Sequence, residues 1–330
     1  MLRSFAPAFF SSIHNVLQKG TVIKSTGSWY QVRLNDGQLL ESRIAGKFRM
    51  GSLKLTNPVA VGDQVLVDTG DDGQGLIVEI LPRRNYVIRQ SPRKKQYLHL
   101  LASNVDQALI IATIAEPNLK QGFIDRFLLM TEPYDIPTAI VFNKADIYQK
   151  AALELYAFLQ SIYEPIGYTM YLVSALGGQG LGELKMLLKD KVTLIGGQSG
   201  VGKSTLVNAI QPNLDLKTFK LSGHSGKGQH TTTFAEMFDL DFGGSIIDTP
   251  GIKTLAFNNL KPLDVAHNFR EFFTYSSQCK FGGQCLHRSE PHCAVKDAIE
   301  AGGISELRYQ NYLSILDDIE NQNYWEIHET

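Results

Sequence analysis

Residues 21–81 alternate between short apolar runs and polar turns. The runs are rich in Val, Ile, Leu and Tyr, and the Gly, Asn and Asp residues between them supply turn chemistry. We expect strands at 21–25, 29–34, 39–44, 64–69 and 76–81. Five short strands within about 65 residues predict a small β-barrel of the OB or SH3 type.

The pattern changes after residue 97 to longer apolar runs that alternate with helical periodicity. Mostly buried strands are expected at 105–114, 138–143, 169–175, 192–197 and 245–250, with helices at 122–132, 149–162, 181–189 and 203–210. A further strand at 234–240 is expected at an antiparallel edge. Strands that alternate with helices predict a doubly wound α/β sheet.

The chain therefore divides into three predicted domains. An OB-like barrel with an N-terminal extension and a basic linker (83–96) covers 1–96, and the α/β domain covers 97–258. From 259 to 330 the sequence is helical around a Cys/His cluster, with helices expected at 262–274, 293–301 and 304–321.

Composition indicates a soluble globular protein, because 43% of the 330 residues are hydrophobic and 20% are charged. No apolar run approaches the roughly 18–20 residues of a transmembrane helix, so we expect a cytoplasmic protein without membrane association. The three cysteines are clustered near the C-terminus, unlike a secreted disulfide framework. The first twenty residues contain no acid and two basic residues, which fits an N-terminal extension or, alternatively, an organellar targeting segment.

Charge is unevenly distributed although the net charge is −1. Residues 1–96 hold 14 Lys and Arg against 7 Asp and Glu, which indicates a polyanionic partner. OB barrels commonly hold oligonucleotides on an open face. The candidate nucleic-acid surface comprises Trp29, Tyr30, Arg33, Arg43, Lys47 and Arg49. The alternative is that Trp29 is a core residue and the charges are only solvated.

The stretch GGQSGVGKST matches the phosphate-binding loop GxxxxGK[ST], with an expected strand before it and an expected helix after it. Glycines let backbone N–H groups close around phosphate oxygens. Lys203 would reach the outer phosphates, and the Ser204 hydroxyl would ligate Mg²⁺. The predicted phosphate-binding residues are Gly197, Gln198, Ser199, Gly200, Val201, Gly202, Lys203, Ser204 and Thr205.

The sequence NKAD at 143–146 ends an expected strand, where ligands of α/β sheets bind. A carboxylate at Asp146 can accept hydrogen bonds from both N1–H and the 2-amino group of guanine. Adenine offers no such pair, so the motif favours GTP over ATP. The loop after another expected strand fits a contact to the guanine O6. The predicted base-binding residues are Asn143, Lys144, Asp146, Ser174 and Ala175.

A third nucleotide element is DTPG at 248–251. Asp248 would hold Mg²⁺ through water, and the Gly251 N–H would sense the γ-phosphate. The segment 223–234 before it is polar and Gly-rich. That composition suits a switch whose threonine ligates Mg²⁺ only when GTP is bound.

The order of these elements differs from the usual order of a GTPase domain. Here NKAD and SAL precede the phosphate loop, and the two switch segments follow it. GTPases usually begin with the phosphate loop and end with NKxD and SAx. The sequence therefore predicts a circularly permuted domain that is cut after the second switch. DTPG then leads directly into the C-terminal segment, which could receive the movement of this switch on hydrolysis.

This arrangement resembles the RsgA (YjeQ/YloQ) family of circularly permuted GTPases that depend on the small ribosomal subunit. The stretches KSTGSWYQV, QHTTTFAEMF and CKF…CLH…EPHCAV carry the resemblance, which covers nearly the whole chain. It implies an OB domain, a permuted GTPase domain, a zinc domain and action late in small-subunit assembly.

The chemistry at the γ-phosphate is only partly indicated. Ile252 occupies the position of the water-orienting glutamine of Ras-type GTPases and cannot orient water, so slow intrinsic turnover is expected. The resemblance favours His230 as the group that orients or deprotonates water, although it could instead contact RNA or order the loop. Likeness to related switches favours Thr232 as the Mg²⁺ ligand, with Thr231 and Thr233 as alternatives.

The cysteines Cys279, Cys285 and Cys293 and the histidine His287 follow the pattern C-x5-C-x-H-x5-C. Three thiolates and one imidazole make a closed tetrahedral Zn²⁺ site, which is structural rather than catalytic. His292 is a competing ligand, and the family motif favours His287. Five residues separate the first two cysteines, more than the family usually has.

These elements together predict a Mg²⁺-dependent GTP hydrolase that assists late maturation of the small ribosomal subunit. It would bind the subunit and its rRNA as a monomer in the GTP form and leave after hydrolysis to GDP. The alternative is a GTP-regulated RNA-binding or chaperone module that does not act primarily on ribosomes. A metabolic kinase is disfavoured because NKAD selects guanine.

Overall fold

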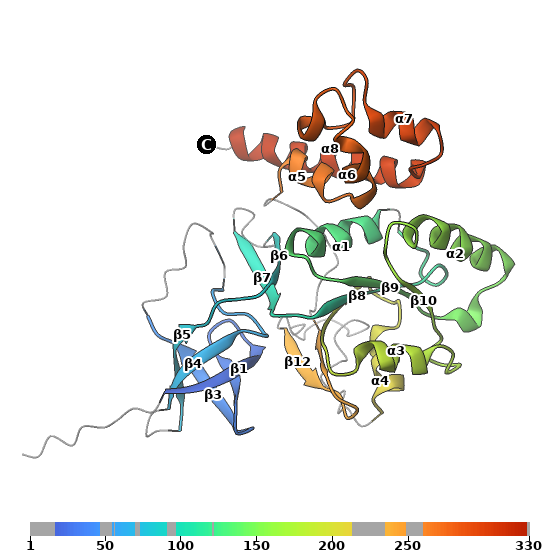
Figure 1. Ribbon diagram of the computed structural model, residues 1–330. Helices are drawn as coiled ribbons and strands as arrows, with labels where there is room; N and C mark the ends of the chain where they lie inside the picture. The colour runs from blue at the N-terminus through green and yellow to red at the C-terminus, as the bar shows by residue number, and fades with distance from the viewer. Residues whose placement is uncertain are drawn as a thin grey trace, which may run out of the picture.

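The computed structural model describes residues 17–46, 55, 57–69, 73–90, 97–120, 122–212, 235–248 and 260–328. Figure 1 shows three parts in chain order: a small β-barrel, a central sheet with helices on both faces, and a group of helices packed over the central part. This architecture confirms the fold class predicted from the sequence. Within the described ranges, no helix combines the length and the apolarity that crossing a membrane requires.

The N-terminal part is a closed five-stranded barrel of the OB type. Its strands are β1 (Leu17–Ser25), β2 (Tyr30–Leu34), β3 (Leu39–Ile44), β4 (Gln64–Thr69) and β5 (Gly75–Ile80). The order is β1-β2-β3-β5-β4, and the pairing of β1 with β4 closes the barrel. Side chains alternate along each strand, so Val22, Val32, Val65 and Ile77 all point into a fully buried core.

The central part is a mostly parallel sheet in the order β10-β9-β8-β11-β13-β12. The strands are β8 (Gln107–Ala112), β9 (Thr138–Phe142), β10 (Met170–Leu172), β11 (Val192–Gly197), β12 (Glu236–Asp239) and β13 (Ser245–Asp248). The helices are α1 (Phe123–Thr131), η1 (Glu132–Tyr134), η2 (Ala145–Ile147), α2 (Lys150–Tyr163), α3 (Leu181–Leu188) and α4 (Lys203–Ile210).

Helices cover both faces of this sheet, as its near-continuous apolar strands require. Ile110 of β8 belongs to the core on the side of α1 and α2, whereas Leu109 and Ile111 belong to the core on the side of α3 and α4. The carboxyl ends of β8, β9, β10 and β11 therefore meet along one edge of the domain. This edge positions the candidate site.

The strand β12 differs from the expected sheet edge. It is antiparallel to β13, as predicted, but its other side meets β1 of the barrel at Lys24 and Glu236. The Lys24 ammonium lies 3.0 Å from the Glu236 carboxylate, and Arg33 forms a second ion pair with Asp239. Barrel and central sheet thus form one continuous sheet of eleven strands.

The segment expected to be a basic linker contains a strand. The strands β6 (Tyr86–Gln90) and β7 (Leu98–Ser103) pair as an antiparallel sheet of their own. Val87 and Ile88 are almost fully buried and pack into two different cores. Burial on both faces of the segment stabilises a strand despite the flanking arginines, and the basic composition of the segment concealed it.

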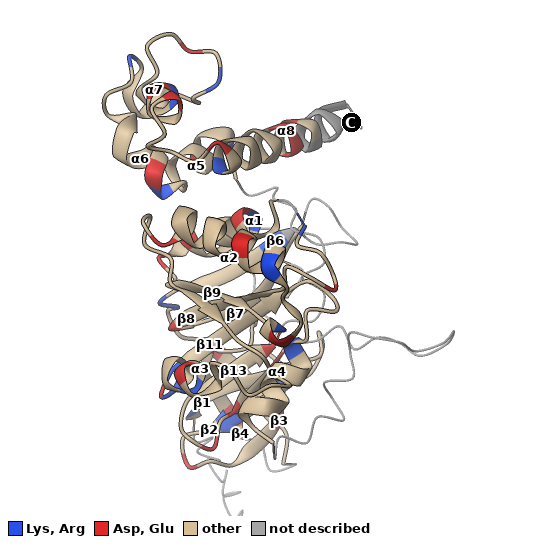
Figure 2. Cartoon of the chain, turned by 90° about the vertical axis from the view of Figure 1, so that its right-hand side faces the viewer, with Lys and Arg blue, Asp and Glu red and all other residues tan. Residues whose placement is uncertain are grey.

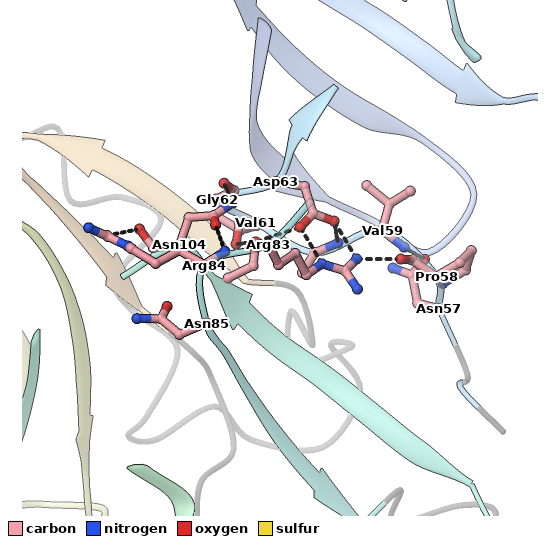
Figure 3. A network of polar contacts seen from close by, with 12 residues as sticks. Asn57, Pro58, Val59, Val61, Gly62, Asp63, Arg83, Arg84, Asn85 and Asn104 are labelled. Carbon is pink, nitrogen blue, oxygen red and sulfur yellow. Dashed lines mark hydrogen bonds and ion pairs between the residues drawn. The ribbon is translucent and has the colours of Figure 1, made fainter. Parts of the chain in front are cut away.

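A buried polar network joins the barrel to the chain that enters the central sheet (Figure 3). Asp63 has no exposed surface, and its carboxylate accepts two hydrogen bonds of 2.6 Å from the Arg83 guanidinium. The Ser103 hydroxyl donates a third, also at 2.6 Å. Beside them, Gly62 has a φ of +95°, and a Cβ there would lie 2.0 Å from the Ser103 carbonyl oxygen. Only glycine fits this close approach.

The C-terminal part consists of helices stacked over α1, as Figures 1 and 2 show from two directions. They are α5 (Pro262–His267), α6 (Arg270–Ser276), η3 (Gly282–Gln284), α7 (Ala294–Glu300) and α8 (Glu306–His328). The single helix expected at 262–274 is broken at Phe269, whose backbone is extended. The break lets the Phe269 ring pack against Phe272 and Tyr312 in the core.

A buried arginine fixes these helices to the central domain. Arg308 of α8 forms two hydrogen bonds with the Glu271 carboxylate, at 2.7 and 2.8 Å, and an ion pair with Asp125 of α1. The Tyr163 hydroxyl of α2 donates to the same Asp125 oxygen, and Asn311 donates to the other. All five side chains are buried, so each charge depends on its partners.

We expect Arg308→Met to destabilise the protein by about 3–5 kcal/mol, because two buried carboxylates would lose their cation. Thermal unfolding and limited proteolysis should show the C-terminal helices released first. Arg126→Met is the matched control, since Arg126 pairs with Asp318 on the surface of the same interface. An exposed pair of this kind contributes only about 0–1 kcal/mol. Equal losses in the two variants would contradict the assignment.

Candidate nucleotide site and metal centre

The phosphate loop joins β11 to α4 at the carboxyl edge of the sheet. Gly200 and Gly202 both have a φ of +85°, a conformation that L side chains rarely adopt. Gly202 caps α4 without any side-chain hydrogen bond to the helix. The first N–H groups of α4, at Lys203, Ser204 and Thr205, therefore face the loop as a helix N-terminus that favours an anion.

The Lys203 ammonium lies within the loop. It donates hydrogen bonds of 2.8 Å to the carbonyl oxygens of Gly197 and Gln198. These contacts hold the positive charge beside the N-terminus of α4, where phosphate oxygens would add to its coordination. Gln198 is buried, whereas Ser199 is exposed at the outer turn of the loop.

Asn143 links three loops that are far apart in the sequence. Its side-chain amide donates to the Val201 carbonyl of the phosphate loop at 3.0 Å. Its side-chain oxygen accepts the Ala175 N–H at 3.1 Å. Asn143 itself is 1% exposed. The three predicted elements NKAD, SAL and the phosphate loop are thus brought together around one buried amide.

The Asp146 carboxylate, predicted to bind the base, is held from one side. The Ser174 hydroxyl donates to one oxygen of Asp146 and accepts the Gly177 N–H at 2.7 Å. Asp146 is exposed, so its carboxylate is accessible to a base. Lys144 has a φ of +67°, and its ammonium donates to the Glu116 carbonyl.

Only some of the predicted magnesium ligands lie within the described residues. Ser204 is half-buried in the first turn of α4, and Asp248 ends β13, which pairs with β11 through Ile195 and Asp248. Hard oxygen donors therefore lie on neighbouring elements, which fits Mg²⁺. Gly251, His230 and the threonines 231–233 lie outside the described residues.

The residues 113–117 are a part of the site that the motifs did not indicate. They follow β8 at the same edge of the sheet, and Glu116 contacts Lys144 as described above. A Cβ built on Gly200 would lie 3.4 Å from the Pro117 ring, so this loop also borders the phosphate loop. In the sequence, the only indication of a role for these residues is that they directly follow an expected buried strand.

The candidate nucleic-acid surface of the barrel is smaller than expected. The Arg43 guanidinium lies 3.9 Å from the centre of the Trp29 ring, and both residues reach the surface. Tyr30 is instead a core residue that donates to Asn57. Arg33 pairs with Asp239 across the junction to β12. Lys47 and Arg49 lie outside the described residues.

The four predicted metal ligands converge in the C-terminal part. All of Cys279, Cys285, His287 and Cys293 are buried, and their ligand atoms lie within 4.8 Å of one another. Cys293 Sγ lies 3.9 Å from each of the other two sulfurs, close to the spacing of about 3.8 Å that a tetrahedral Zn²⁺–thiolate geometry gives. His287 faces them with Nδ1, at 3.3 Å from Cys293 Sγ.

The surroundings of the cluster suit a structural zinc site. Burial lowers the pKa of His287, which favours the neutral imidazole that binds metal. The backbone carbonyl of His287 accepts the Tyr309 hydroxyl at 2.8 Å, and this fixes the ligand loop to α8. His292, the competing ligand, is exposed and does not belong to the cluster.

This fold and this site define a circularly permuted P-loop GTPase with an OB-type barrel and a Cys₃His metal cluster. The sequence profile of the RsgA GTPase domain matches residues 80–258, and that of the RsgA N-terminal domain matches residues 19–77. The protein belongs to the RsgA family of GTPases.

Curated relatives and solved structures support this membership over most of the chain. A Bacteroides fragilis protein named small ribosomal subunit biogenesis GTPase RsgA is 47% identical, covering 93% of this chain and 98% of its own. One of the same name from Flavobacterium psychrophilum is 50% identical, covering 90% and 92%.

The crystal structure of YjeQ from Thermotoga maritima aligns with a TM-score of 0.74 at 34% identity, covering 92% of this chain and 99% of that one. YloQ, described as a circularly permuted GTPase, aligns with a TM-score of 0.69 at 31% identity, covering 94% and 98%.

We expect Asp146→Asn to weaken GDP binding by about 10- to 100-fold, because a charge-assisted pair of hydrogen bonds to guanine is lost. Xanthosine diphosphate should bind the variant better than GDP, since an amide matches its N1 and O2 side. Isothermal titration calorimetry measures both. Asp135→Asn, at the opposite end of β9, is the control and should bind GDP normally. Unchanged GDP affinity in Asp146→Asn would remove this carboxylate from the site.

We expect one zinc ion per chain, and Cys285→Ser should lose it because a closed four-ligand site needs every thiolate. Hydrogen exchange should then rise throughout the C-terminal helices while basal GTPase activity survives. His292→Ala is the matched control and should retain the metal. Metal analysis of the purified proteins gives the answer, and a wild-type protein without zinc would refute the site.

Proposed function

We propose that this GTPase acts in biogenesis of the small ribosomal subunit, as the names of its relatives state for them. The observation that supports the GTPase part of the proposal is the buried amide of Asn143, which joins the NKAD, SAL and phosphate loops, and the ribosomal part rests on the relatives. The protein would bind the immature subunit and its rRNA in the GTP form and leave after hydrolysis. Its place would be the cytoplasm, and it would act as a monomer without membrane contact.

The described residues would bind the nucleotide at two places, its guanine base and its phosphates. Asp146, held by Ser174, would bind the guanine edge, and Lys144 would lie along the base. The loop from Gly197 to Thr205 would bind the phosphates through backbone N–H groups and the Lys203 ammonium. Binding at both places depends on contacts that are already formed, so little reorganisation would oppose it.

Magnesium would be held by the Ser204 hydroxyl, by Thr232 and, through water, by Asp248. The ion would neutralise charge on the β- and γ-phosphates. His230 would orient or deprotonate the attacking water, and the Gly251 N–H would respond to the γ-phosphate. Ile252 stands at the position of the water-orienting glutamine of Ras-type GTPases and cannot orient water, so intrinsic turnover would be slow and would depend on His230 and the partner.

The pairing of β1 with β12 suggests how a partner could reach the switch. The sequence between the phosphate loop and β12 contains His230 and the three threonines. β12 is bound on its outer side by Lys24 and Arg33 of the barrel. rRNA contacts at Trp29 and Arg43 would therefore act on a barrel whose first strand is hydrogen-bonded to the end of the switch segment.

We expect purified small subunits to raise the GTPase rate at least tenfold, and large subunits to leave it unchanged. His230→Ala should lose about 10²–10⁴-fold of the stimulated rate, the usual contribution of a general base, with GTP affinity within twofold of wild type. His224→Ala is the matched control in the same segment, and Lys203→Ala should abolish hydrolysis altogether. Phosphate release under single-turnover conditions is the measurement.

Absence of stimulation, or equal stimulation by both subunits, would overturn the ribosomal role. A normal stimulated rate in His230→Ala would leave that role intact and remove His230 from catalysis.

A further inference from the structure

Tyr148 is a buried tyrosine immediately after η2, and nothing in the nucleotide motifs accounts for its hydroxyl. The side chain is 8% exposed. Its oxygen accepts the Ile114 N–H at 2.8 Å and donates to the Asn143 carbonyl at 2.9 Å. Thr113 Oγ1 lies 3.2 Å away as a third polar contact. A single hydroxyl thus connects the residue that begins NKAD with the loop that follows β8.

The loop at 113–117 carries this connection to the rest of the site. Thr113 donates to the Ala115 carbonyl at 2.7 Å, which closes a tight turn at its start. Further along, the Glu116 carbonyl accepts the Lys144 ammonium. The Pro117 ring then lies against Gly200 of the phosphate loop. The loop is therefore a strut between the base-recognition and phosphate-recognition elements, fastened at one end by Tyr148.

We propose that the Tyr148 hydroxyl is a positioning residue for guanine-nucleotide binding, which locks the 113–117 strut to Asn143 and so sets Lys144 and Asp146 relative to the phosphate loop. This inference rests on the proposed GTP site and names a part of it that no nucleotide motif contains. Tyr148 would not touch the nucleotide. Its effect would pass through the Asn143 backbone and the Glu116–Lys144 contact.

The chemistry of the hydroxyl suits this role. Burial raises the pKa of Tyr148, so the group remains a protonated donor at any physiological pH. Phenylalanine would fill nearly the same volume but would leave a buried N–H and a buried carbonyl without this partner. Such groups seek new partners, and we expect the 113–117 loop, which carries the Ile114 N–H, to shift in response. The base loop would then lose its fixed distance from the phosphate loop.

The test is Tyr148→Phe in the full-length protein, with Tyr156→Phe as the matched control. Tyr156 lies on the adjacent helix α2 and packs edge-on against Phe142, and its hydroxyl forms none of the contacts that join Tyr148 to Asn143 and Ile114. We expect the Kd for GDP to rise roughly tenfold in Tyr148→Phe and to stay within twofold in Tyr156→Phe. The kcat at saturating GTP with small subunits should be unchanged, because the catalytic groups keep their places.

Inosine diphosphate separates positioning from general destabilisation, because it lacks the 2-amino group that Asp146 is expected to bind. A displaced base loop should reduce the preference for GDP over IDP, whereas a loosened fold would weaken both nucleotides equally and lower the melting temperature. Thr113→Val removes a second hydroxyl from the same turn and should shift the preference in the same direction.

Unchanged GDP affinity in Tyr148→Phe, or equal losses for GDP and IDP, would overturn the proposal. A wild-type protein that binds neither nucleotide would instead overturn the proposed function, so the two failures are distinguishable.

Discussion

The nucleotide site depends on one buried amide, that of Asn143. Its NH₂ group donates to the phosphate loop and its oxygen accepts from the SAL loop. A single planar group thus provides the partner for one backbone carbonyl and one backbone N–H. Aspartate could not donate and leucine could do neither, and each would leave a backbone group of this buried region unpaired. The loops come from positions about 30 and 60 residues away in the chain. Their common geometry is therefore a product of the parallel sheet, which brings the strand ends together.

This dependence on strand ends explains why circular permutation leaves the site intact. The order β9-β8-β11-β13 places NKAD, the strut, the phosphate loop and Asp248 side by side, whichever strand comes first in the chain. Permutation changes what each end of the domain is joined to. β13 now leads toward the C-terminal helices. The chain reaches β8 from the barrel, at the place where the Asp63–Arg83 network joins the two parts. The arrangement of these loops is thus independent of the chain order, whereas the connections to the neighbouring domains are not.

Sequence patterns predicted this structure well where local signals agree with the fold. The expected bounds of β3, β4, β11 and α4 match those observed, because each is flanked by glycine or turn residues. The strand β6 was missed because its arginines suggested a linker, and only the burial of Val87 and Ile88 against distant residues makes it a strand. The cysteine spacing predicted the metal cluster, since its ligands are near in sequence. Tyr148 could not be predicted, because its partners are defined only by the packing of η2 against the 113–117 loop.

The β1–β12 contact and the C-terminal junction differ in strength, and the difference indicates which one can transmit a signal. At the C-terminal junction, Arg308 is fully buried and pairs with Asp125 of α1, which also accepts a hydrogen bond from Asn311, so separation would break a buried network of mutually supporting contacts. Between β1 and β12, the pairs Lys24–Glu236 and Arg33–Asp239 are partly exposed, and each contributes about 0–1 kcal/mol, whereas the buried Asp63–Arg83 network holds the barrel at the other side of the same junction. Binding energy of a few kcal/mol at the barrel is therefore sufficient to change the β1–β12 contact, but not to release the C-terminal helices. A partner that binds both ends would hold the C-terminal helices as a fixed base and act on the switch segment through the barrel.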